Sequence, residues 1–481
     1  MRVMLVVNPR KPSFPPYLDM SLLSLVSNLG EHQATIYDLF MDLLATRRSA
    51  LALLREAIQD FRPDLVALGA MSYQFAAAQR IATFVKAAFP RVKTVLGGWH
   101  LTGVVEEGLP DEDYRAFDFL IYGQGEATLT ELCDALDGEG ELSTIPGLLF
   151  RDGDRFVRNA WRKPEAGAVL HPPKRDAYLN LERMRPIMRR YFTSHQGEAT
   201  RGCPHACSYC TNLVMNRGVI LRFPVERVIE DMKAVQRLGG RSYIFTDENV
   251  LEDPDYFERL CLAILDHKLN GMHLMAGVST ESVVRRPELI PLARDAGFLA
   301  VGVGAESVLS KNLVFFNKSW SAPDLHRRTV EILNQAGLIH VSFLIIGVPE
   351  DDEQRIRYQF QIMQQLGTTP FPFFLTPLPG TRLKRQVEGL GLIRIKDLSY
   401  YDTQTAVMDT LHLSIDQLEA IRRKELLRYY LTSGFLARLF PRGGKLSFGL
   451  ALRYLAGYLP LHARSLLHRQ GERSVYDWFR W

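Results

Sequence analysis

Short apolar runs recur along the first 135 residues and are separated by stretches with helical periodicity. The residues within each run do not alternate with polar ones, which is typical of strands buried on both faces of a parallel sheet. Strands that alternate with helices indicate a doubly wound, flavodoxin-like domain over residues 1–135, with ligands expected in the loops after the strands. The predicted strands are residues 2–7, 33–39, 64–71, 92–98 and 118–123.

The alternation of strands and helices pauses over residues 136–197. This segment contains a hairpin-like stretch around a turn at Asp152–Gly153, followed by a stretch rich in Pro and Arg. We therefore interpret residues 136–197 as the connection between two domains.

The alternation restarts at Glu198, and six βα units are predicted over residues 198–390. Six units are fewer than a closed eightfold barrel needs, so we expect an open, partial (β/α)6 barrel. One of its helices is expected to open at Ser321, with Pro323 just inside. The predicted barrel strands are residues 198–203, 242–249, 273–280, 298–307, 340–348 and 372–378.

Beyond about residue 390 the pattern predicts helices without strands. The clearest of them starts at the capping pair Ser414 and Gln417. The expected fold class is therefore α/β, with a doubly wound domain, a partial barrel and a helical C-terminal domain over residues 391–481.

Composition and charge exclude several classes of protein. The 481 residues are 47% hydrophobic and 23% charged, as in an ordinary globular chain, and no stretch resembles a signal peptide or a membrane span. The net charge of +4 is concentrated in residues 438–481, where eight Lys or Arg stand against two acidic residues. The remainder is close to neutral, so we expect no nucleic-acid partner.

The basic residues near the C-terminus are interleaved with large apolar residues over positions 435–481. This pattern is typical of an amphipathic helix that packs on its own domain. It is also typical of an interfacial helix that rests on an anionic membrane, which gives a hypothesis of peripheral membrane contact through this tail. The sequence leaves both alternatives open.

Three of the five cysteines, Cys203, Cys207 and Cys210, lie within eight residues directly after a predicted strand. A short cluster of this kind in a chain with few cysteines points to metal binding in a reducing, cytoplasmic compartment rather than to disulfides. Thiolates select zinc or an iron–sulfur cluster, and zinc would need a fourth ligand, for which His205 is the candidate. The remaining cysteines, Cys133 and Cys261, stand in apolar helical stretches where a buried thiol is expected.

The C-x3-C-x2-C spacing, with Tyr209 before the last cysteine, resembles the defining motif of the radical S-adenosylmethionine (SAM) superfamily. The resemblance implies a [4Fe–4S] cluster held by Cys203, Cys207 and Cys210, with SAM chelating the fourth iron. It also implies that one electron from a flavodoxin- or ferredoxin-type donor cleaves SAM to a 5′-deoxyadenosyl radical, so the cofactor carries out the difficult step and the protein positions it.

The resemblance further implies which residues meet SAM, at the carboxyl ends of successive barrel strands. Taken singly, a Gly-x-Gly before a helix is more typical of a tight turn, and a glutamate at a strand end is equally typical of a cap or an ion pair. Their order and spacing behind the cysteines favour the SAM interpretation. The matched positions are Tyr209, Thr246, Asp247, Glu248, Gly302, Gly304, Glu306, Ser307, Gly347, Pro349, Pro379, Gly380 and Thr381.

A doubly wound domain directly before such a core resembles the cobalamin-dependent subgroup of the superfamily. The resemblance implies cobalamin contacts in the loops of the first domain, although the glycines there are also typical of βα turns. The loop after the first strand contains Asn8 and Arg10 but lacks the histidine that ligates cobalt in the wider cobalamin family, so His100 is expected to contact the corrin or its side chains. The matched positions are Ser72, Gly97, Gly98, His100, Gly123, Gly125 and Glu126.

The resemblance implies an enzyme that transfers a methyl group from methylcobalamin to an unactivated carbon of a small or lipid-like substrate. A second enzyme class remains open, in which the same cofactors serve cyclisation or rearrangement without methyl transfer, as in the anaerobic magnesium-protoporphyrin cyclase class. A methylthiotransferase is disfavoured, because a second cluster would need three more suitably placed cysteines. A corrinoid- or zinc-binding protein without catalysis is the non-enzymatic alternative. No residue is singled out as a catalytic acid or base.

Overall fold

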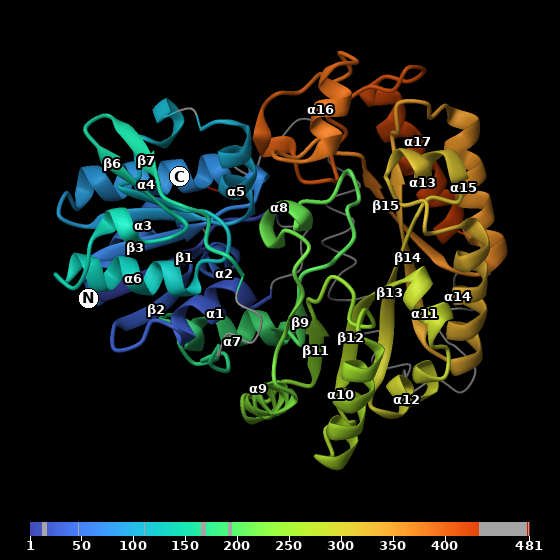
Figure 1. Cartoon of the computed structure of the whole chain (residues 1–481), viewed down its shortest axis with the longest axis horizontal. Coiled ribbons are helices and arrows are strands. Elements are labelled where there is room, and N and C mark those ends of the chain that lie inside the picture. The colour runs from blue at the N-terminus through green and yellow to red at the C-terminus, as the bar shows by residue number, and fades with distance from the viewer. Residues whose placement is uncertain are drawn as a thin grey trace.

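The computed structural model describes residues 1–11, 17–46, 48–109, 111–164, 170–190, 195–431, 479 and 481. They form a seven-stranded sheet and a six-stranded sheet, each covered by helices. Figure 1 shows the N-terminal unit, in blue to teal, beside the C-terminal barrel, in green to orange, with α8 where the two units meet. The predicted α/β class is therefore confirmed.

The N-terminal sheet has the strand order β2-β1-β3-β4-β5-β6-β7, and its first five strands are parallel. Apolar side chains of these strands are buried on both faces: Met4 and Val6 pack in one core, and Val3 and Leu5 pack in the other. This order and double burial confirm the predicted flavodoxin-like domain. The parallel strands are β1 (Arg2–Val7), β2 (Gln33–Asp38), β3 (Leu65–Gly69), β4 (Lys93–Gly97) and β5 (Phe119–Ile121).

Helices cover both faces of this sheet (Figure 1). One core is closed by α3, α4 and α5, and the other by α1, α6 and α7, while α2 contributes to both cores. Their bounds are α1 (Met20–Ser27), α2 (Leu39–Ala45), α3 (Ala50–Phe61), α4 (Phe75–Ala88), α5 (Trp99–Glu107), α6 (Glu126–Leu136) and α7 (Leu181–Arg190).

The segment expected to connect the domains adds two strands to the N-terminal sheet. Strand β6 (Leu148–Asp152) pairs antiparallel with β5, and β7 (Arg155–Arg158) pairs antiparallel with β6. The predicted turn at Asp152–Gly153 joins them, and Leu148 and Leu149 enter the two opposite cores. The sheet therefore extends beyond residue 135, the boundary expected from the sequence.

The second sheet has the order β15-β14-β13-β12-β11-β8, and all of its strand pairs are parallel. Six parallel strands in an open sheet confirm the predicted partial barrel. Strand bounds are β8 (His195–Gly197), β11 (Ser242–Phe245), β12 (His273–Ser279), β13 (Phe298–Glu306), β14 (Ile339–Ile346) and β15 (Thr369–Phe374). Helices that accompany this sheet are α9 (Val225–Arg237), α10 (Pro254–Asp266), α11 (Thr280–Arg285), α12 (Leu289–Asp295), α13 (Ser310–Phe315), α14 (Pro323–Ala336) and α15 (Glu353–Leu366).

The first barrel strand differs from the expected segment, residues 198–203. Strand β8 ends at Gly197, and the short strand β9 (Thr200–Arg201) then pairs antiparallel with β10 (Leu221–Arg222). The ladder stops because the backbone N–H groups of Ala199 and Thr200 donate to the carboxylate of Asp247 instead of to a neighbouring strand. The cysteine loop and α8 (Asn212–Asn216) lie between β9 and β10.

The C-terminal region contains α16 (Arg382–Glu388) and α17 (Ile415–Tyr430) among the described residues. Helix α17 starts at the predicted capping pair, where Ser414 and Gln417 each accept from the other's backbone N–H. It packs on α15 and so closes one side of the barrel.

Within the described part of the chain, no helix is long and apolar enough to cross a membrane. The hypothesis of an interfacial helix concerns residues 435–481, which lie outside the described residues except for Phe479 and Trp481. These two rings contact the N-terminal domain: Phe479 lies 6.1 Å from Phe40, and the guanidinium of Arg80 lies 5.0 Å from the Trp481 ring.

Candidate active site

The three clustered cysteines lie on one loop between β9 and α8, at the carboxyl edge of the barrel sheet. All three thiols are free and partly buried, and the Cys210 N–H donates to the Cys207 carbonyl at 3.2 Å, which closes the turn. Burial raises the pKa of Cys203 to about 11 and that of Cys210 to about 12, and the neighbouring thiols add to the rise. A cationic metal centre would therefore be needed to hold all three as thiolates.

The side chains around the loop favour an iron–sulfur cluster over zinc. Among the residues that the structure describes, no group of three or more His, Cys, Asp or Glu side chains is arranged to hold a metal ion. His205, the candidate fourth zinc ligand, stacks on Trp320 at 4.0 Å, and its Nε2 lies 3.5 Å from Glu252. A four-iron cluster binds each thiolate at a different iron, so its ligands need not close on one ion, and this fits the loop better.

Two carboxylates after β11 hold the chain where it enters the cysteine loop. Asp247 is buried and accepts from the N–H and the hydroxyl of Thr200, and Glu248 accepts from the N–H of Gly202 at 2.8 Å. Burial raises the pKa of Asp247 to about 7, although these hydrogen bonds oppose the rise. Thr246 is exposed at the same edge. Asp247 and Glu248 therefore position the loop, and direct contact of these three residues with SAM stays a prediction.

A buried ion pair lies beside the loop at the end of β13. Glu306 has a left-handed backbone (φ +60°), and its carboxylate accepts from Lys318 Nζ at 3.0 Å. The same Nζ donates to the Gly304 carbonyl at 2.8 Å. Burial raises the pKa of the Tyr209 hydroxyl, and the charge of Glu306 raises it further. Burial also raises the pKa of Cys207, and the charge of Lys318 opposes that rise. These groups form a charged corner suited to a zwitterion such as the amino-acid end of SAM.

Lys318 is a site residue that the sequence analysis missed. Lys318 is 4% exposed, and its ammonium group lies 5.0 Å from the Trp320 ring and pairs with Glu306. A buried lysine needs such a partner, because an unpaired buried charge is costly. The connection between α13 and α14 contains no recognisable motif, and folding alone brings Lys318 back to the end of β13.

The other predicted SAM residues of β13 have distinct surroundings. A Cβ at Gly302 would lie 2.5 Å from the ring of Phe343 on β14, so this glycine makes room for an aromatic side chain. A Cβ at Gly304 would lie 3.0 Å from the Glu306 carboxylate. Ser307 donates its hydroxyl to Gln359 of α15, which ties the strand end to a covering helix. Contact of Gly302, Gly304 and Ser307 with SAM stays a prediction.

The loop after β14 is held by a buried carboxylate. Asp351 accepts from the N–H groups of Gly347 and Val348, at 3.0 and 3.1 Å, and from the side chain of Asn312. Pro349 lies in the same loop and accepts from the N–H of Leu411. This loop, which carries the matched positions Gly347 and Pro349, is thus held in place by the protein's own hydrogen bonds.

The loop after β15 contacts the N-terminal domain through its backbone. A Cβ at Gly103 of α5 would lie 2.3 Å from the carbonyl oxygen of Pro379, so a side chain here would strike that backbone. The N–H of Gly380 donates to Glu107 at 2.6 Å, and Thr381 caps α16. The loop that carries the matched positions Pro379, Gly380 and Thr381 is therefore part of the domain interface.

Helix α8, which follows Cys210, also packs on α5. Arg217 donates to Glu106 at 2.8 Å, and Gln124 donates to Asn216 at 3.2 Å. Nearby, Arg201 pairs with the buried carboxylate of Glu126 at 2.8 Å. These contacts involve α5, the loop after β5 and the start of α6, so the cysteine loop lies against the elements that follow β4 and β5 of the N-terminal sheet.

His100 is enclosed within the N-terminal domain. It is 2% exposed, its Nδ1 lies 3.3 Å from Ser72 Oγ and its Nε2 lies 3.0 Å from the Tyr114 hydroxyl. Its ring lies 4.3 Å from that of Phe75, and burial lowers its pKa to about 3. Both nitrogens of a neutral imidazole are thus engaged, and this arrangement fixes the loop that carries Ser72.

The predicted cobalamin glycines lie at the tight βα turns of the same edge. Gly98 has φ +100°, and a Cβ there would lie 2.9 Å from the Ala70 nitrogen. Gly97 is the last residue of β4, and Gly123 and Gly125 lie in the turn between β5 and α6. Glu126 accepts from Ser24 at 2.6 Å, in addition to its pair with Arg201. Direct cobalamin contact of the seven matched residues stays a prediction.

The loop after β1 presents groups that fit the amide-fringed rim of a corrin. Arg10 is 1% exposed, and its guanidinium lies 3.7 Å from the Tyr17 ring. Asn8 Oδ1 and Arg10 Nη1 are buried and have no hydrogen-bond partner among the described residues. One is an acceptor and the other is a donor, so together they would satisfy an amide side chain of cobalamin.

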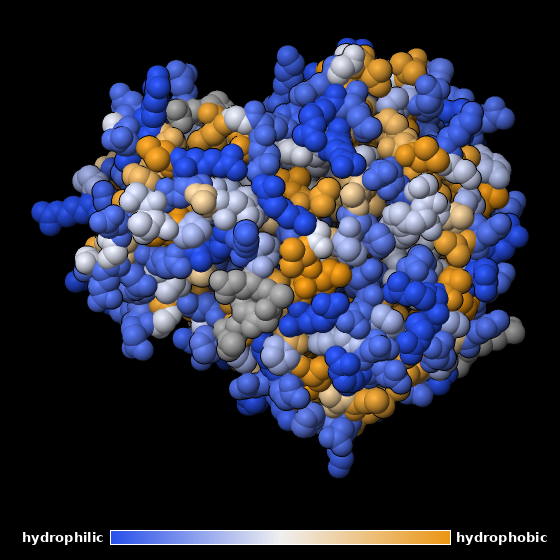
Figure 2. Space-filling model, in the orientation of Figure 1, coloured by the Kyte–Doolittle hydropathy of each residue, from blue (hydrophilic) through white to orange (hydrophobic). Residues whose placement is uncertain are grey.

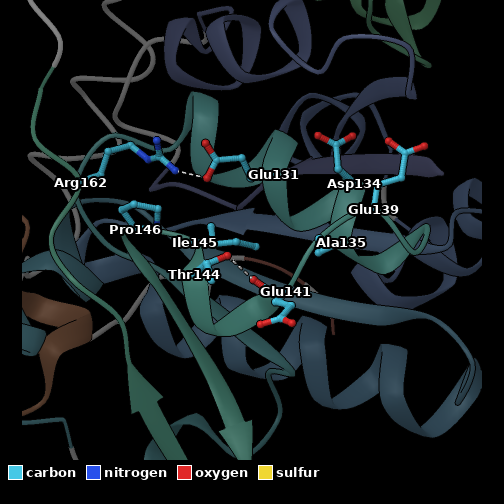
Figure 3. A pocket seen from close by; sticks show the side chains of 10 residues that line it. Glu131, Asp134, Ala135, Glu139, Glu141, Thr144, Ile145, Pro146 and Arg162 are labelled. Carbon is cyan, nitrogen blue, oxygen red and sulfur yellow. Dashed lines mark hydrogen bonds and ion pairs between the residues drawn. The ribbon is translucent and has the colours of Figure 1, made fainter.

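A cavity of about 370 Å³ lies on the N-terminal domain, away from this edge. Figure 3 shows Glu131, Asp134, Glu139 and Glu141 around it, with Arg162 paired to Glu131. It is lined by the later part of α6, whereas the candidate site is at the start of that helix. The described residues around it are not arranged to hold a metal ion.

Comparison with known proteins places these two domains in established families. Residues 198–358 match the radical SAM superfamily, and residues 19–133 match the B12 binding domain. The chain is therefore a radical SAM enzyme whose core follows a B12-binding domain. This combination places it among the cobalamin-dependent radical SAM enzymes, whose cofactors are a [4Fe–4S] cluster, SAM and cobalamin.

Three similar proteins illustrate the range of this group. An anaerobic magnesium-protoporphyrin IX monomethyl ester cyclase of Cereibacter sphaeroides is 24% identical, over 97% of this chain and 73% of its own. A bacteriochlorophyllide d C-12(1)-methyltransferase of Chlorobaculum tepidum is 26% identical, over 75% of this chain and 73% of its own. The structure of the cobalamin-dependent radical enzyme OxsB, with aqua-cobalamin and SAM bound, is similar in fold. Its TM-score is 0.71 at 14% identity, over 97% of this chain and 71% of that one.

Proposed function

We propose that this enzyme transfers a methyl group to an unactivated carbon of a small or lipid-like substrate. The observation that carries the proposal is the packing of α8 on α5, because it sets the cysteine loop against the B12-binding domain. When bound, the cluster and SAM supply a radical that activates the substrate carbon, and cobalamin supplies the methyl group. A shared edge between the two domains would let one substrate meet both.

The residues around this edge have positioning roles in the proposal. Lys318 would bind the SAM carboxylate and Glu306 its ammonium group, because the two side chains already stand as a buried pair of opposite charge. Asp247 and Glu248 would keep the cysteine loop in place through the hydrogen bonds they accept. Arg10 would meet the corrin rim.

The interior face of the barrel supports an apolar substrate. Successive side chains of a strand point to opposite faces, so Phe371 and Phe373 of β15 lie on the face opposite Phe374, which packs under α15 and α17. Together with Phe343 they form a group of rings 5.0 to 6.1 Å apart, of which Phe371 is 39% exposed. Figure 2 shows hydrophobic side chains gathered near the centre of the visible face, between the two units.

A second candidate function is cyclisation or rearrangement with the same cofactors and without methyl transfer. The similarity to the magnesium-protoporphyrin cyclase favours it, because the match extends over 97% of this chain. Tetrapyrroles are also apolar and aromatic, so the phenylalanine group suits either function. We place either reaction in the cytoplasm, because free thiols that bind a metal cluster persist in a reducing compartment.

One experiment separates these functions. The protein is reconstituted without oxygen with iron, sulfide and cobalamin, and is incubated with SAM and a strong reductant. We then measure 5′-deoxyadenosine and S-adenosylhomocysteine by mass spectrometry. Both products together support methyl transfer, and deoxyadenosine without S-adenosylhomocysteine supports the cyclase. Neither product, from protein with full iron and cobalamin content, would show that the chain binds metal without this catalysis.

A further inference from the structure

A second cavity, of about 180 Å³, lies beside the cysteine loop, between α8 and the start of α16. Two of the three cluster cysteines, Cys207 and Cys210, contribute to its lining. The charged corner at Glu306 and Lys318 belongs to β13 and the loop before α14, so it is a different set of residues. The cavity therefore gives a second approach to the loop.

The mouth of this cavity carries an excess of positive charge. Arg217, Arg382 and Arg385 line it and are all exposed. Arg217 is paired with Glu106, but Arg382 and Arg385 form no ion pair with the residues that the structure describes. The nearby Glu107 is already bound by Lys384. Two unpaired guanidinium groups beside cluster ligands attract a negatively charged partner.

The proposed function requires such a partner, since SAM cleavage consumes one electron each time. Within the described ranges no further group of His, Cys, Asp or Glu is arranged to hold a metal. Cys133 and Cys261 are fully buried in helices of separate cores. The described residues thus offer no second metal centre that could supply the electron, and we take the donor to be a separate protein. Electron transfer slows steeply with distance, so the donor has to dock where the cluster ligands approach the surface.

We propose that the cavity mouth between α8 and α16 is the docking face for a small acidic electron-carrier protein. The inference rests on the proposed function and names the partner of the same site. In the complex the carrier loses one electron and the cluster gains it, while no bond forms and no proton moves between the partners. Leu213 and Val214 provide an apolar centre, and Arg382 and Arg385 provide the charged rim.

The test uses the reconstituted holoenzyme and a reduced acidic flavodoxin as the probe. The variant carries Arg382→Glu and Arg385→Glu. Its matched control carries Arg91→Glu and Arg241→Glu, which change the net charge equally at two other exposed arginines that form no ion pair with the described residues. We measure the rate of deoxyadenosine formation and, separately, the Kd of oxidised flavodoxin.

At low ionic strength we expect the variant to be roughly tenfold slower with flavodoxin than its control, with a comparable rise in Kd, because charge reversal at a rim removes electrostatic steering. The difference should shrink as salt rises, since the screening length falls from about 30 Å at 0.01 M to about 10 Å at 0.1 M. Equal flavodoxin affinity and equal rates in variant and control would overturn the docking face.

Dithionite separates docking from catalysis, because a small inorganic reductant needs no docking face. With dithionite the variant should form deoxyadenosine at the wild-type rate. An equal loss with dithionite and with flavodoxin would show that the arginines serve the fold or another ligand, and it would overturn the proposal. A wild-type enzyme that forms no deoxyadenosine with dithionite would overturn the proposed function itself, and the docking face with it.

Discussion

At the scale of single residues, the environment of a side chain decides its role more than its type does. The chain has five cysteines, but Cys133 and Cys261 are fully buried among apolar helix residues, where burial raises the pKa of each thiol. Cys203, Cys207 and Cys210 are instead partly exposed on one loop. All five side chains are thiols, but we expect enzyme activity to depend on the three loop cysteines and not on the two buried ones.

We expect Cys207→Ala to abolish deoxyadenosine formation. The fourth iron of the cluster is available to SAM only while three thiolates bind the other three irons. Cys261→Ala is the matched control and should retain the cluster, since Cys261 lies in α10 within the barrel core. The measurements are iron content per chain and deoxyadenosine by mass spectrometry. Full SAM cleavage by the Cys207 variant would contradict the cluster assignment.

The pair Lys318–Glu306 should be strongly coupled, because both side chains are almost fully buried. We expect Lys318→Met to lower the free energy of unfolding by about 3–5 kcal/mol, since it leaves a buried carboxylate without its partner. The double variant with Glu306→Gln should be more stable than the single variants predict by addition. Urea unfolding of all four proteins gives the coupling, and additive losses would mean that the pair does not interact.

His100 should make stability depend on pH. Its folded pKa of about 3 lies below the value of about 6.5 in unfolded chains, so its contribution is complete above about pH 6.5 and is lost as the pH falls toward 3. We expect the Tm of the wild type to fall more steeply than that of His100→Gln between about pH 7 and about pH 5. Asp38 and Asp247, with pKa values raised to about 7, titrate in both proteins and cancel in the comparison. Parallel Tm profiles would exclude this role.

At the scale of elements, the pattern of apolar residues predicted most strands and helices, because buried parallel strands are recognisable from their own sequence. The failures come from partners distant in the chain. Strand β8 ends at Gly197 because the N–H groups of Ala199 and Thr200 donate to the carboxylate of Asp247. Asp247 is 50 residues further along the chain than Gly197. The hairpin was predicted, but its pairing with β5 was not. The cap of α14 is Ala322, since the hydroxyl of Ser321 pairs with Thr280 instead.

The contact between α5 and the loop after β15 predicts a sensitive position. Gly103→Val should separate the two backbones, because even a Cβ there would lie 2.3 Å from the Pro379 carbonyl. We expect a loss of methyl transfer with deoxyadenosine formation less affected, since the cysteine loop itself is unchanged. Gly271→Val is the control, because nothing lies within 4 Å of a Cβ at that position and its backbone is not left-handed. Equal product ratios in both variants would show that this contact does not matter for coupling the two domains.

At the scale of the whole molecule, the two domains meet at the carboxyl edges of their sheets. The cysteine motif and the order of the domains were evident from the sequence, since short motifs and βα alternation are local. The position of Lys318 and the contacts of α8 with α5 were not, because they arise from tertiary packing between segments without motifs. The candidate site was thus predictable where its residues adjoin the cysteines or follow strands.

The carboxyl edge of the N-terminal sheet also predicts how cobalamin binds. The loop after β1 has no imidazole, and both nitrogens of His100 are engaged within the domain. We expect cobalamin to bind with its dimethylbenzimidazole tail displaced and with no protein nitrogen below cobalt, so the paramagnetic resonance spectrum of the cobalt(II) form should lack nitrogen splitting along the axis. A nitrogen triplet that disappears in His100→Ala would show that the imidazole turns toward the metal.

The contacts of Phe479 and Trp481 with the N-terminal domain also concern the order of synthesis. Phe40 and Arg80 leave the ribosome early, but the rings that cover them follow about 400 residues later. At the usual rate of translation this is a delay of roughly 20–80 s, far longer than a small domain needs to fold. The first domain can therefore fold while part of its apolar surface is still uncovered, because the barrel is still being translated. A chaperone that binds nascent chains would have the most time to bind at the surface around Phe40 and Arg80.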